Sequence, residues 1–386
     1  MRLAILNSNY VSISKNTKKG SEIFDRILIS GLAKIAKKNN IQITAFASGN
    51  SKLPVPIKSV NYYSSTEDKC IGTTYSLIFE LALISKALTM HKQFDLYHVN
   101  IGEGSTILPF ARFVNKPILV TMHGSLTEKH KLKYFSLFKD VKNIFFVSIS
   151  NSQRKPIPNL NYIKTIYHGI DIKRSFRFNP VGDNNIIWTG RAMPDKGLDV
   201  VLQVVKRTRK KAKVFPIIKE EYIQWFHQEI IKKRNLINQV VRINLDFDVR
   251  RSELVKQYQT SKLFLFPLQW EEPFGLTLIE SMACGTPIVA YARGSIPEIV
   301  KDGETGFIVN SSDDDIRGNW IIKKTGIDGL CEAVERIYSM PEEEYKKMRL
   351  ACRVHIEKNF TVEKMVDQYE EVYREVIDKY RKTRSV

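Results

Sequence analysis

The sequence predicts an α/β protein built from two doubly wound parallel sheets. Short runs of branched apolar residues alternate with longer amphipathic stretches, and each run has the length of a buried strand. Two such series follow one another along the 386 residues, a length that suits two domains. Strands that alternate with helices are typical of parallel sheets covered by helices on both faces.

Each series contains six expected strands. The first six lie at residues 3–6, 41–46, 96–99, 118–122, 144–147 and 163–167. The second six lie at residues 186–189, 214–218, 240–243, 263–267, 288–291 and 307–309. Between the series, residues 172–185 contain Pro, Gly and Asn without periodicity, and we place the linker between the domains there. Apolar residues three and four apart at 361–381 predict a final amphipathic helix.

Composition excludes several classes of protein. With 43% hydrophobic and 26% charged residues, the chain is neither disordered nor collagenous. It contains no run of 18 apolar residues, and the apolar run at its N-terminus is too short for a signal peptide, so we expect a cytoplasmic protein. The net charge is +19, and residues 1–172 carry 23 basic but only 10 acidic residues. This excess suggests a polyanionic partner: nucleic acid, an anionic membrane surface or a phosphorylated ligand.

The segment 270–309 carries the most informative motif. After an expected strand, Phe274-Gly275-Leu276 begins a helix, where free backbone amides and the helix dipole favour anions or hydroxyl oxygens. Glu272 precedes this helix and Glu280 lies within it, with seven residues between them. Two carboxylates in these positions can each bind vicinal hydroxyls, such as those on the hexose and the ribose of a nucleotide sugar.

This segment resembles the signature of retaining glycosyltransferases of the GT-B fold, most of all glycosyltransferase family 4 (glycosyl transferases group 1). Members carry a Glu-x7-Glu pair, then a helix end of small residues and a glycine turn that ends in Pro-Glu. Here the last two are Ala283-Cys284-Gly285-Thr286-Pro287 and Gly294-Ser295-Ile296-Pro297-Glu298. The resemblance implies that Glu272 binds the donor sugar, Glu280 the ribose, and the amides of Phe274, Gly275 and Leu276 the sugar hydroxyls. A surface helix with two solvated glutamates is the alternative.

A cationic loop follows the first strand of the second series. It reads Gly-Arg-x4-Lys-Gly and contains Arg191 and Lys196 just before a helix. A diphosphate requires two or more positive charges, which a planar guanidinium and an ammonium supply. In the family this loop binds the donor diphosphate, so the resemblance implies that Arg191 and Lys196 stabilise the departing phosphate. A solvated loop is the alternative.

Two positions in the first half also match the family. Gly20, at the end of the loop after the first strand, resembles the glycine that lies against the donor phosphates, although relatives often have two glycines and this chain has Lys19 instead. Lys19 therefore either adds phosphate-binding charge or widens the loop, and a simple helix cap is the alternative. His123 follows the strand at 118–122, and the resemblance implies that it positions the donor sugar near the reacting carbon. We read His98 and His168 as packing or loop residues.

The resemblance implies two Rossmann-like domains that face a cleft. Residues 1–172 would form the acceptor-side domain, joined by the returning C-terminal helix within 361–386, and residues 173–360 the domain that binds the nucleotide sugar. We expect a hexosyl unit to pass, with retention, from a nucleoside-diphosphate sugar to a glycan, lipid-linked or small-molecule acceptor. At 214–219 the chain lacks a glycine that relatives often have, so the base stays open.

No group of residues has the spacing of metal ligands, and we expect no cofactor and no essential metal. The stretch from Lys129 to Lys142 mixes lysines with aromatic residues. It is either a helix that binds an anionic membrane surface, which would place the protein peripherally at the inner membrane surface, or a core helix with a lysine-rich outer face. A nucleotide-sugar epimerase, a glycan phosphorylase and a non-catalytic basic protein that binds nucleic acid or a membrane are the alternative functions. Nucleic acid is the partner that the motifs favour least.

Overall fold

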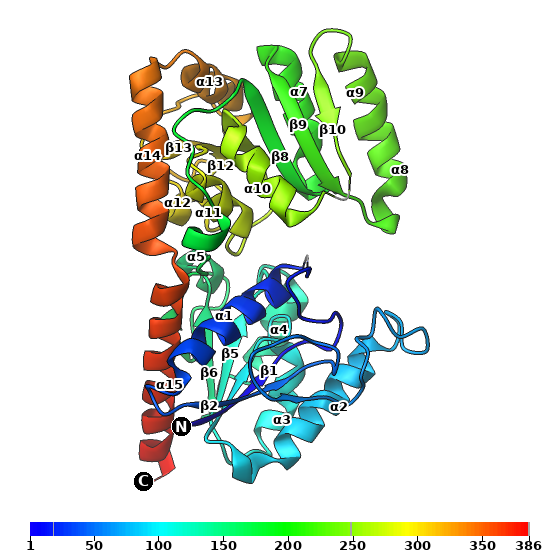
Figure 1. Ribbon diagram of the computed structural model, residues 1–386, viewed down its shortest axis with the longest axis vertical. Coiled ribbons are helices and arrows are strands. Elements are labelled where there is room, and N and C mark those ends of the chain that lie inside the picture. Colours follow the sequence, from blue (N-terminus) through cyan, green and yellow to red (C-terminus); the bar gives the residue numbers. More distant parts are fainter. Residues whose placement is uncertain (18, 248, 385–386) are drawn as a thin grey trace. The chain divides into compact units, whose positions relative to one another are not determined.

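The computed structural model describes residues 1–17, 19–247 and 249–384, and the chain divides into two compact units. The first unit contains Met1–Gly169 and Val362–Val386, and the second contains Ile170–Thr361 (Figure 1). The expected domain boundaries were 172/173 and 360/361. Each unit has its own parallel sheet and its own hydrophobic core, as the alternation of strands and helices predicts.

The sheet of the first unit has seven parallel strands in the order β3-β2-β1-β4-β5-β6-β7. Six of them are the expected ones, and the additional strand, β3, is only two residues long and pairs with the end of β2. Two residues, of which one is a lysine, give no recognisable strand signal in the sequence. The strands are β1 (Arg2–Leu6), β2 (Gln42–Phe46), β3 (Ile57–Lys58), β4 (Leu96–Val99), β5 (Ile118–Met122), β6 (Ile144–Ser148) and β7 (Tyr162–Thr165).

Helices cover both faces of this sheet because alternate strand residues point to opposite sides. Leu3 and Ile5 pack toward α1 (Gly20–Ala36) and α15 (Val362–Arg384), whereas Ala4 and Leu6 belong to the core on the other face. The second face is covered by α2 (Ser76–Thr89), α3 (Leu108–Ala111) and α4 (Lys129–Ser136). The short helices η1 (His91–Gln93), η2 (Ser105–Ile107) and α5 (Asn151–Arg154) lie in the connections.

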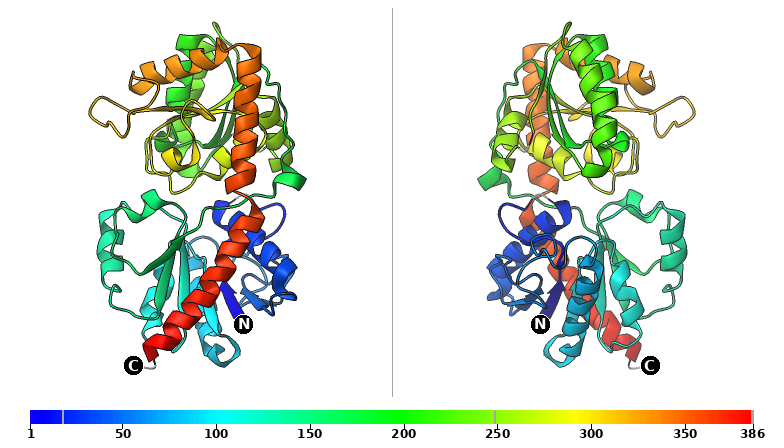
Figure 2. Two further views of the ribbon diagram at one scale, coloured as in Figure 1. Left: turned by 90° about the vertical axis from the view of Figure 1, so that its left-hand side faces the viewer. Right: turned by 90° about the vertical axis from the view of Figure 1, so that its right-hand side faces the viewer.

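The C-terminal helix α15 is joined to the first sheet by a buried chain of hydrogen bonds. Figure 2 shows α15 as one long helix against the strands of this unit. The Tyr373 hydroxyl lies 2.8 Å from Nδ1 of His98, whose Nε2 lies 2.7 Å from the Thr121 hydroxyl. The Tyr369 hydroxyl lies 2.9 Å from the same Thr121 oxygen. Burial lowers the pKa of His98 to about 3, so this histidine is a neutral core residue.

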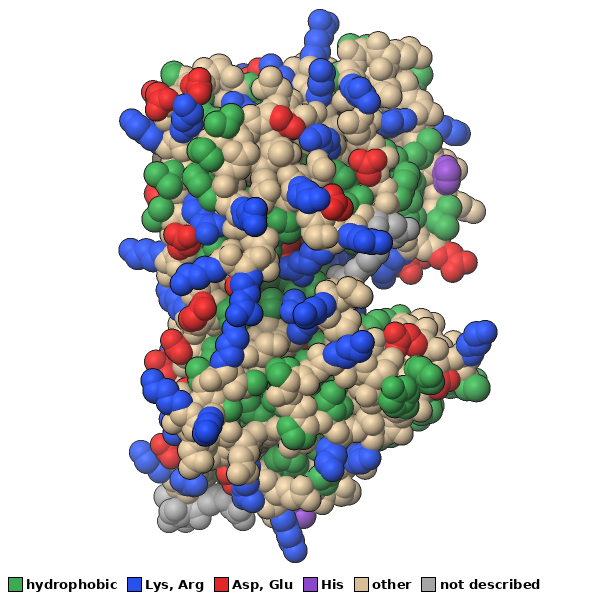
Figure 3. All heavy atoms as spheres, viewed as in Figure 1, with side chains coloured by type: hydrophobic (Ala, Val, Ile, Leu, Met, Phe, Trp, Pro, Cys, Tyr) green, Lys and Arg blue, Asp and Glu red, His purple; other side chains and the backbone are tan. Residues whose placement is uncertain are grey.

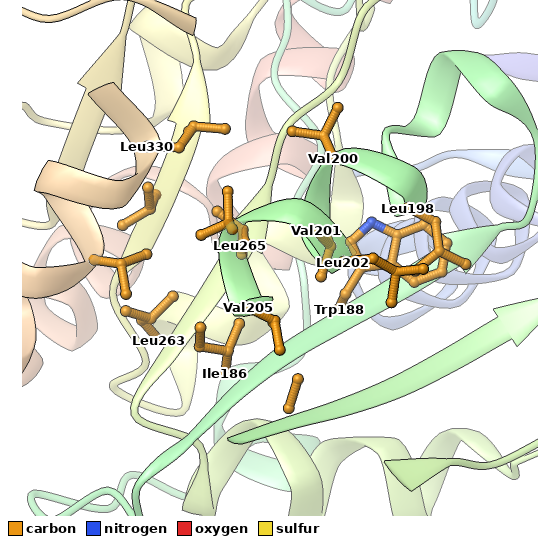
Figure 4. Close-up of a cluster of buried hydrophobic side chains, with 14 of the residues drawn as sticks. Ile186, Trp188, Leu198, Val200, Val201, Leu202, Val205, Leu263, Leu265 and Leu330 are labelled. Carbon is orange, nitrogen blue, oxygen red and sulfur yellow. The ribbon is translucent and has the colours of Figure 1, made fainter. Parts of the chain in front are cut away.

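The sheet of the second unit has six parallel strands in the order β10-β9-β8-β11-β12-β13. Figure 4 shows its core, where Trp188 and Ile186 of β8 meet the apolar side of α7. The strands are β8 (Asn185–Arg191), β9 (Lys211–Ile217), β10 (Ile243–Leu245), β11 (Leu263–Phe266), β12 (Ile288–Tyr291) and β13 (Gly306–Val309). The helices are α6 (Ile172–Ser175), η3 (Pro194–Lys196), α7 (Leu198–Thr208), η4 (Glu220–Tyr222), α8 (Ile223–Trp225), η5 (Phe226–Ile231), α9 (Lys232–Ile237), α10 (Arg251–Thr260), α11 (Leu276–Ala283), α12 (Ile296–Ile299), α13 (Gly326–Tyr338) and α14 (Glu342–Asn359).

Two expected strands of this unit have other bounds in the structure. The strand expected at 214–218 begins earlier, as β9 at Lys211, shortly after α7 ends at Thr208. The two lysines at 211 and 213 alternate with the buried residues Ala212 and Val214, which is the pattern of a strand with one face in the core. The strand expected at 240–243 lies instead at Ile243–Leu245, after α9, which ends at Ile237.

Residues 172–185, expected to be a linker, belong to the second unit. The buried guanidinium of Arg349 in α14 holds this segment through a hydrogen bond from Nε to the carbonyl of Asn179, at 2.8 Å. The same guanidinium donates to the carbonyls of Ser261 and Gln259, each at 2.9 Å. One side chain thus satisfies carbonyl groups from residues 172–185 and from the end of α10, and periodicity along the sequence cannot show such a contact.

We predict that Arg349→Met strongly destabilises the second unit. It removes three hydrogen bonds to backbone carbonyls and leaves the carbonyl of Asn179 without a donor among the described residues. Loss of the partner of a buried group costs about 1–3 kcal/mol. For a domain of this size, the melting temperature should fall by roughly 2–4 °C for each kcal/mol. The exposed Lys347 lies on the same helix, so Lys347→Met is the matched control in a calorimetric comparison. Equal melting temperatures for the two variants would contradict the assignment.

The surface of the chain is rich in positive charge. Lys and Arg side chains outnumber Asp and Glu side chains on the face drawn in Figure 3. Within the described residues, no helix has both the length and the apolar character that crossing a bilayer requires.

Candidate functional site

The cationic loop of the second unit lies next to the segment that carries the glutamates, because β8 and β11 are neighbours in the sheet. β8 ends at Arg191, and the short helix η3 places Lys196 just before α7. Gly197 has a φ of +70°, and a Cβ at this position would lie 2.1 Å from the carbonyl oxygen of Pro267, just after β11. Glycine therefore allows the two loops to pack directly against each other.

Lys196 and Glu272 form an ion pair between these two loops. Nζ of Lys196 lies 2.9 Å from Oε2 of Glu272, and the two side chains are only 12% and 14% exposed. The indole Nε1 of Trp270 donates to the same carboxylate oxygen at 3.1 Å. Nζ of Lys196 also lies 4.2 Å from the centroid of this indole, so the ammonium faces both a carboxylate and an aromatic ring.

The glycine turn found in the sequence holds Glu272 in place from the other side. Gly294 has a φ of +54°, and a Cβ there would lie 2.2 Å from the carbonyl oxygen of Glu272. The next residue, Ser295, donates its backbone N–H to that carbonyl at 2.9 Å and its hydroxyl to the carbonyl of Phe274 at 2.8 Å. This turn therefore fixes the backbone on both sides of Pro273.

The preceding residue, Glu271, belongs to a network of four charged side chains. Its carboxylate lies 2.7 Å from Arg317 and 3.4 Å from Arg293, and both arginines also pair with Asp315 at 2.7–2.8 Å. The hydrogen bond from Arg317 lowers the pKa of Asp315. Asp315, in the acidic run at 313–315, therefore helps to support the segment that carries Glu272.

Glu280 is engaged by a cation that the sequence did not indicate. It lies on α11, is 5% exposed, and pairs through Oε1 with Arg251 at the start of α10. Burial raises the pKa of Glu280, and the charge and hydrogen bond of Arg251 oppose that increase. Arg251 therefore helps to keep a buried carboxylate ionised.

The other predicted residues of this unit surround the same loops. Phe274 is buried, Gly275 is the N-cap of α11 with a φ of +82°, and Leu276 is its first residue, so the first amides of this helix have no partner within the helix. The side chain of Arg191 is exposed at the end of β8. Among the described residues it forms no ion pair with Glu272 or Glu280. The structure thus brings Lys196 and Glu272 into contact, whereas Arg191 and Glu280 form no ion pair with either of them.

His123 lies in the first unit at the end of β5. Its ring packs on Phe24, with centroids 4.7 Å apart, and stacks on His168 at 5.6 Å. Nε2 of His123 is buried and has no hydrogen-bond partner among the described residues. Burial, together with the charge of Lys19, lowers the pKa of His123 to about 3, so the imidazole is neutral at physiological pH. A neutral imidazole can orient a hydroxyl group but does not supply a positive charge.

Gly20 begins α1 directly after Lys19. Nζ of Lys19 lies 2.8 Å from Oε1 of Glu22, and this glutamate side chain is fully buried. The Ser21 hydroxyl donates to the other oxygen of Glu22 at 2.6 Å. The positive charge of Lys19 is therefore balanced by the carboxylate of Glu22, three residues further along the chain.

A second buried acid on α1 lacks such a partner. Neither carboxylate oxygen of Asp25 has a hydrogen-bond partner of ordinary geometry among the described residues, and the same holds for the side-chain amide of Asn100, after β4. Burial and the nearby charge of Glu22 raise the pKa of Asp25 well above its usual value, while Lys19 and Asn100 oppose the shift. Both side chains are fully buried, so α1 and the loop after β4 hold polar groups with unused hydrogen-bonding capacity.

Comparison with known proteins shows which family model part of the second unit resembles. Residues 170–323 match the family model described as glycosyl transferases group 1. The N-acetyl-alpha-D-glucosaminyl L-malate synthase of Bacillus anthracis is 32% identical over 35% of this chain and 33% of its own length. A relative from Klebsiella pneumoniae is 26% identical over 55% of each chain, so the chain spans about half or less of the length of these curated relatives.

Solved structures resemble the whole chain. The sucrose-phosphate synthase of Thermosynechococcus elongatus is 17% identical, with a TM-score of 0.75 over 98% of this chain and 99% of its own. Anabaena HepE, solved in complex with UDP and glucose, is 15% identical, with a TM-score of 0.72 over 97% of this chain and 100% of its own. The chain has the GT-B glycosyltransferase fold of two Rossmann-like domains. At these identities, the likeness concerns the fold alone.

The sequence predicted which loops carry the charged residues, but it missed two of their partners. Trp270 stands beside the glutamate motif, and its aromatic character next to two carboxylates was the available signal. Arg251 lies 29 residues before Glu280, and no local pattern connects them. Within the described residues, no three His, Cys, Asp or Glu side chains are grouped as metal ligands would be.

We predict that Asp25→Asn makes the first unit more stable at neutral and alkaline pH. Because the pKa of Asp25 is raised in the folded state, its ionisation opposes folding as the pH rises above the unfolded value near 4. The amide does not titrate, so its advantage over the native chain should be absent near pH 4 and should grow with pH. Thermal unfolding between pH 4 and 9 measures this difference, and a constant difference across the range would refute it. Asp140→Asn, at an exposed position, is the control.

Proposed function

We propose that this protein is a retaining glycosyltransferase that moves a hexosyl unit from a nucleoside-diphosphate sugar to an acceptor. The acceptor would be a glycan, a lipid-linked sugar or a small molecule. The single observation that carries the proposal is the contact between Lys196 and Glu272, which joins the cationic loop to the glutamate motif inside one unit. The match of residues 170–323 to glycosyl transferases group 1 and the UDP and glucose bound by HepE support it.

The ion pair suits a site that exchanges charges when its ligand binds. Without a ligand, Glu272 neutralises an ammonium that has little contact with solvent, and this avoids an unpaired buried charge. A diphosphate would attract Lys196 and the exposed Arg191, and Glu272 would then be able to accept hydrogen bonds from sugar hydroxyls. The amides at the start of α11 would donate to the same sugar.

The reaction we propose is a substitution on the face of the leaving group. The acceptor hydroxyl would attack the anomeric carbon while the bond to the donor phosphate breaks, and the departing phosphate oxygen would take the proton from this hydroxyl. Lys196 and Arg191 would stabilise the negative charge on the phosphate. Because the imidazole of His123 is neutral, its role would be to orient the sugar or the acceptor by hydrogen bonding.

The first experiment identifies the donor. A thermal-shift screen with UDP, GDP, ADP and their sugars should reveal one nucleotide that stabilises the protein. Product analysis then separates the proposal from its alternatives, because an epimerase needs no acceptor and a phosphorylase requires inorganic phosphate. A protein that no nucleotide sugar stabilises would contradict the proposal.

We predict that Lys196→Met lowers kcat/KM for the donor by about 100- to 1,000-fold, the usual effect of removing one group that stabilises developing charge. The variant should remain folded, since Glu272 keeps its hydrogen bond from Trp270. Lys206→Met, which changes an exposed lysine on α7, is the matched control. Steady-state kinetics and circular dichroism together test the prediction, and near-normal turnover by Lys196→Met would exclude the assigned role.

We also predict that Arg251→Met weakens donor binding more at low pH than at high pH. Without Arg251, the burial of Glu280 is unopposed, so the pKa of this carboxyl rises and more of it is protonated near neutrality. A protonated carboxyl is a poor acceptor of hydrogen bonds from the ribose hydroxyls. Donor binding by the variant should therefore recover as the pH rises and the carboxyl ionises. Calorimetric titration with the intact nucleotide sugar, whose diphosphate does not titrate in this range, at pH 6 and pH 9 measures the effect. An equal loss at both pH values would mean that Arg251 does not act through Glu280.

A further inference from the structure

The helix expected at Lys129 to Lys142 is shorter than predicted, and most of its aromatic side chains face the core. α4 spans Lys129–Ser136, where Phe135 is 1% exposed, and Tyr134 and Phe138 pack against the buried cluster. The apolar residue of this stretch that reaches solvent is Leu137, which is 61% exposed. These aromatic residues therefore belong to the core.

A different aromatic residue is exposed next to the arginine that contacts Leu137. Phe113, just after α3, is 85% exposed, more than any other large hydrophobic residue in the described part of the chain. Its neighbour Arg112 donates from Nη2 to the carbonyl of Leu137 at 3.4 Å, which brings the ends of α3 and α4 together. Phe113 and Leu137 are thus two exposed apolar residues at connections that Arg112 links, and we call them the Phe113–Leu137 tip.

Positive charge surrounds this tip with little compensation. Residues 112–142 contain seven Lys or Arg and two Asp or Glu residues. One of the seven, Lys131, is balanced by Glu103 and Glu128. On α4, Lys129 and Lys133 share one stripe with Leu137, because residues four apart lie on the same side of a helix. The six cations that form no ion pair with any other described residue are Arg112, Lys116, Lys129, Lys133, Lys139 and Lys142.

The tip lies on one face of the first sheet, together with other exposed apolar residues of this unit. α2, α3 and α4 lie on the face of the sheet opposite α1 and α15 (Figure 1). Every large hydrophobic residue of this unit that is described as exposed lies in this layer or in the connection before it, and none lies on α1 or α15. They are Tyr62, Tyr63, Tyr75, Leu77, Ile78, Phe113 and Leu137. Exposed apolar residues are ordinary when scattered, but Phe113 and Leu137 lie within residues 112–142, where positive charge is in excess.

We propose that the Phe113–Leu137 tip and its surrounding cations dock the protein on an anionic lipid bilayer. Phe and Leu side chains would enter the boundary between headgroups and acyl chains, while the lysines and Arg112 contact anionic headgroups. Neither feature suffices alone, since two apolar side chains bind a bilayer weakly and exposed cations are screened by salt. The occupant is a membrane surface because nucleic acid would make use of the cations but not of an exposed Phe–Leu pair.

The test is co-sedimentation of the full chain with vesicles of phosphatidylcholine containing 30% phosphatidylglycerol, beside vesicles of phosphatidylcholine alone. We expect binding to the anionic vesicles in 50 mM NaCl and a loss of at least tenfold in 500 mM NaCl. Phe113→Ser/Leu137→Ser should weaken binding by about tenfold or more. Lys129→Gln/Lys133→Gln/Lys139→Gln should weaken it by on the order of fivefold for each lysine removed.

The matched control is Leu350→Ser/Val354→Ser, which removes two exposed apolar residues from α14, where neighbouring cations pair with glutamates. It should bind the vesicles like the native chain. The proposal is overturned if the control loses as much binding as the tip variant, or if both vesicle types bind equally. It is also overturned if a DNA duplex displaces the vesicles from the native chain and the Phe113→Ser/Leu137→Ser variant binds the vesicles as well as the native chain does. Vesicle binding does not depend on catalysis, so this result is independent of the proposed function.

Discussion

A lysine that is almost excluded from solvent must have an anionic partner, and much of the second unit is arranged to give Lys196 one. Its partner Glu272 comes from a loop 76 residues further along the chain. The two meet because β8 and β11 are adjacent parallel strands, so the loops that follow them leave the sheet at the same edge. Gly197 lets the first loop approach closely, and the Gly294 turn fixes the second. The strand order thus determines which charges can pair.

The first unit depends on a different kind of contact. A helix from the far end of the chain, α15, packs on one face of its sheet. Tyr369 and Tyr373 of this helix form a buried chain of hydrogen bonds with His98 and Thr121. A neutral hydrogen-bonded chain specifies one position for the helix without the cost of burying charge. Thr121 lies two residues before His123, so the packing of α15 also supports the loop that carries the predicted sugar-positioning histidine.

The sequence predicts the central strands well, because each is a compact apolar run whose neighbours are polar or helical. The sequence predicts a segment poorly where contacts with a distant part of the chain determine its structure. The two-residue β3 exists because it pairs with β2, and residues 172–185 are held by Arg349, far away on α14. The motifs likewise located Lys196 and Glu272, whereas Arg251 reaches Glu280 only through the packing of α10 beside α11. Contacts of this kind leave no periodic trace in the sequence.

Some buried polar groups of the first unit lack the partners that the two motif glutamates of the second unit have, and this contrast bears on the proposed reaction. In the second unit each glutamate of the motif faces a cation, which suits a site whose ligand is itself charged and must displace an existing partner. In the first unit, Asp25, Asn100 and Nε2 of His123 have no hydrogen-bond partner of ordinary geometry among the described residues. The amide of Asn100 carries no charge, and His123 is neutral at physiological pH. Unpaired buried groups are costly unless water or a ligand satisfies them. Neutral hydroxyl groups, which both donate and accept hydrogen bonds, are the ligand chemistry that such an array would favour.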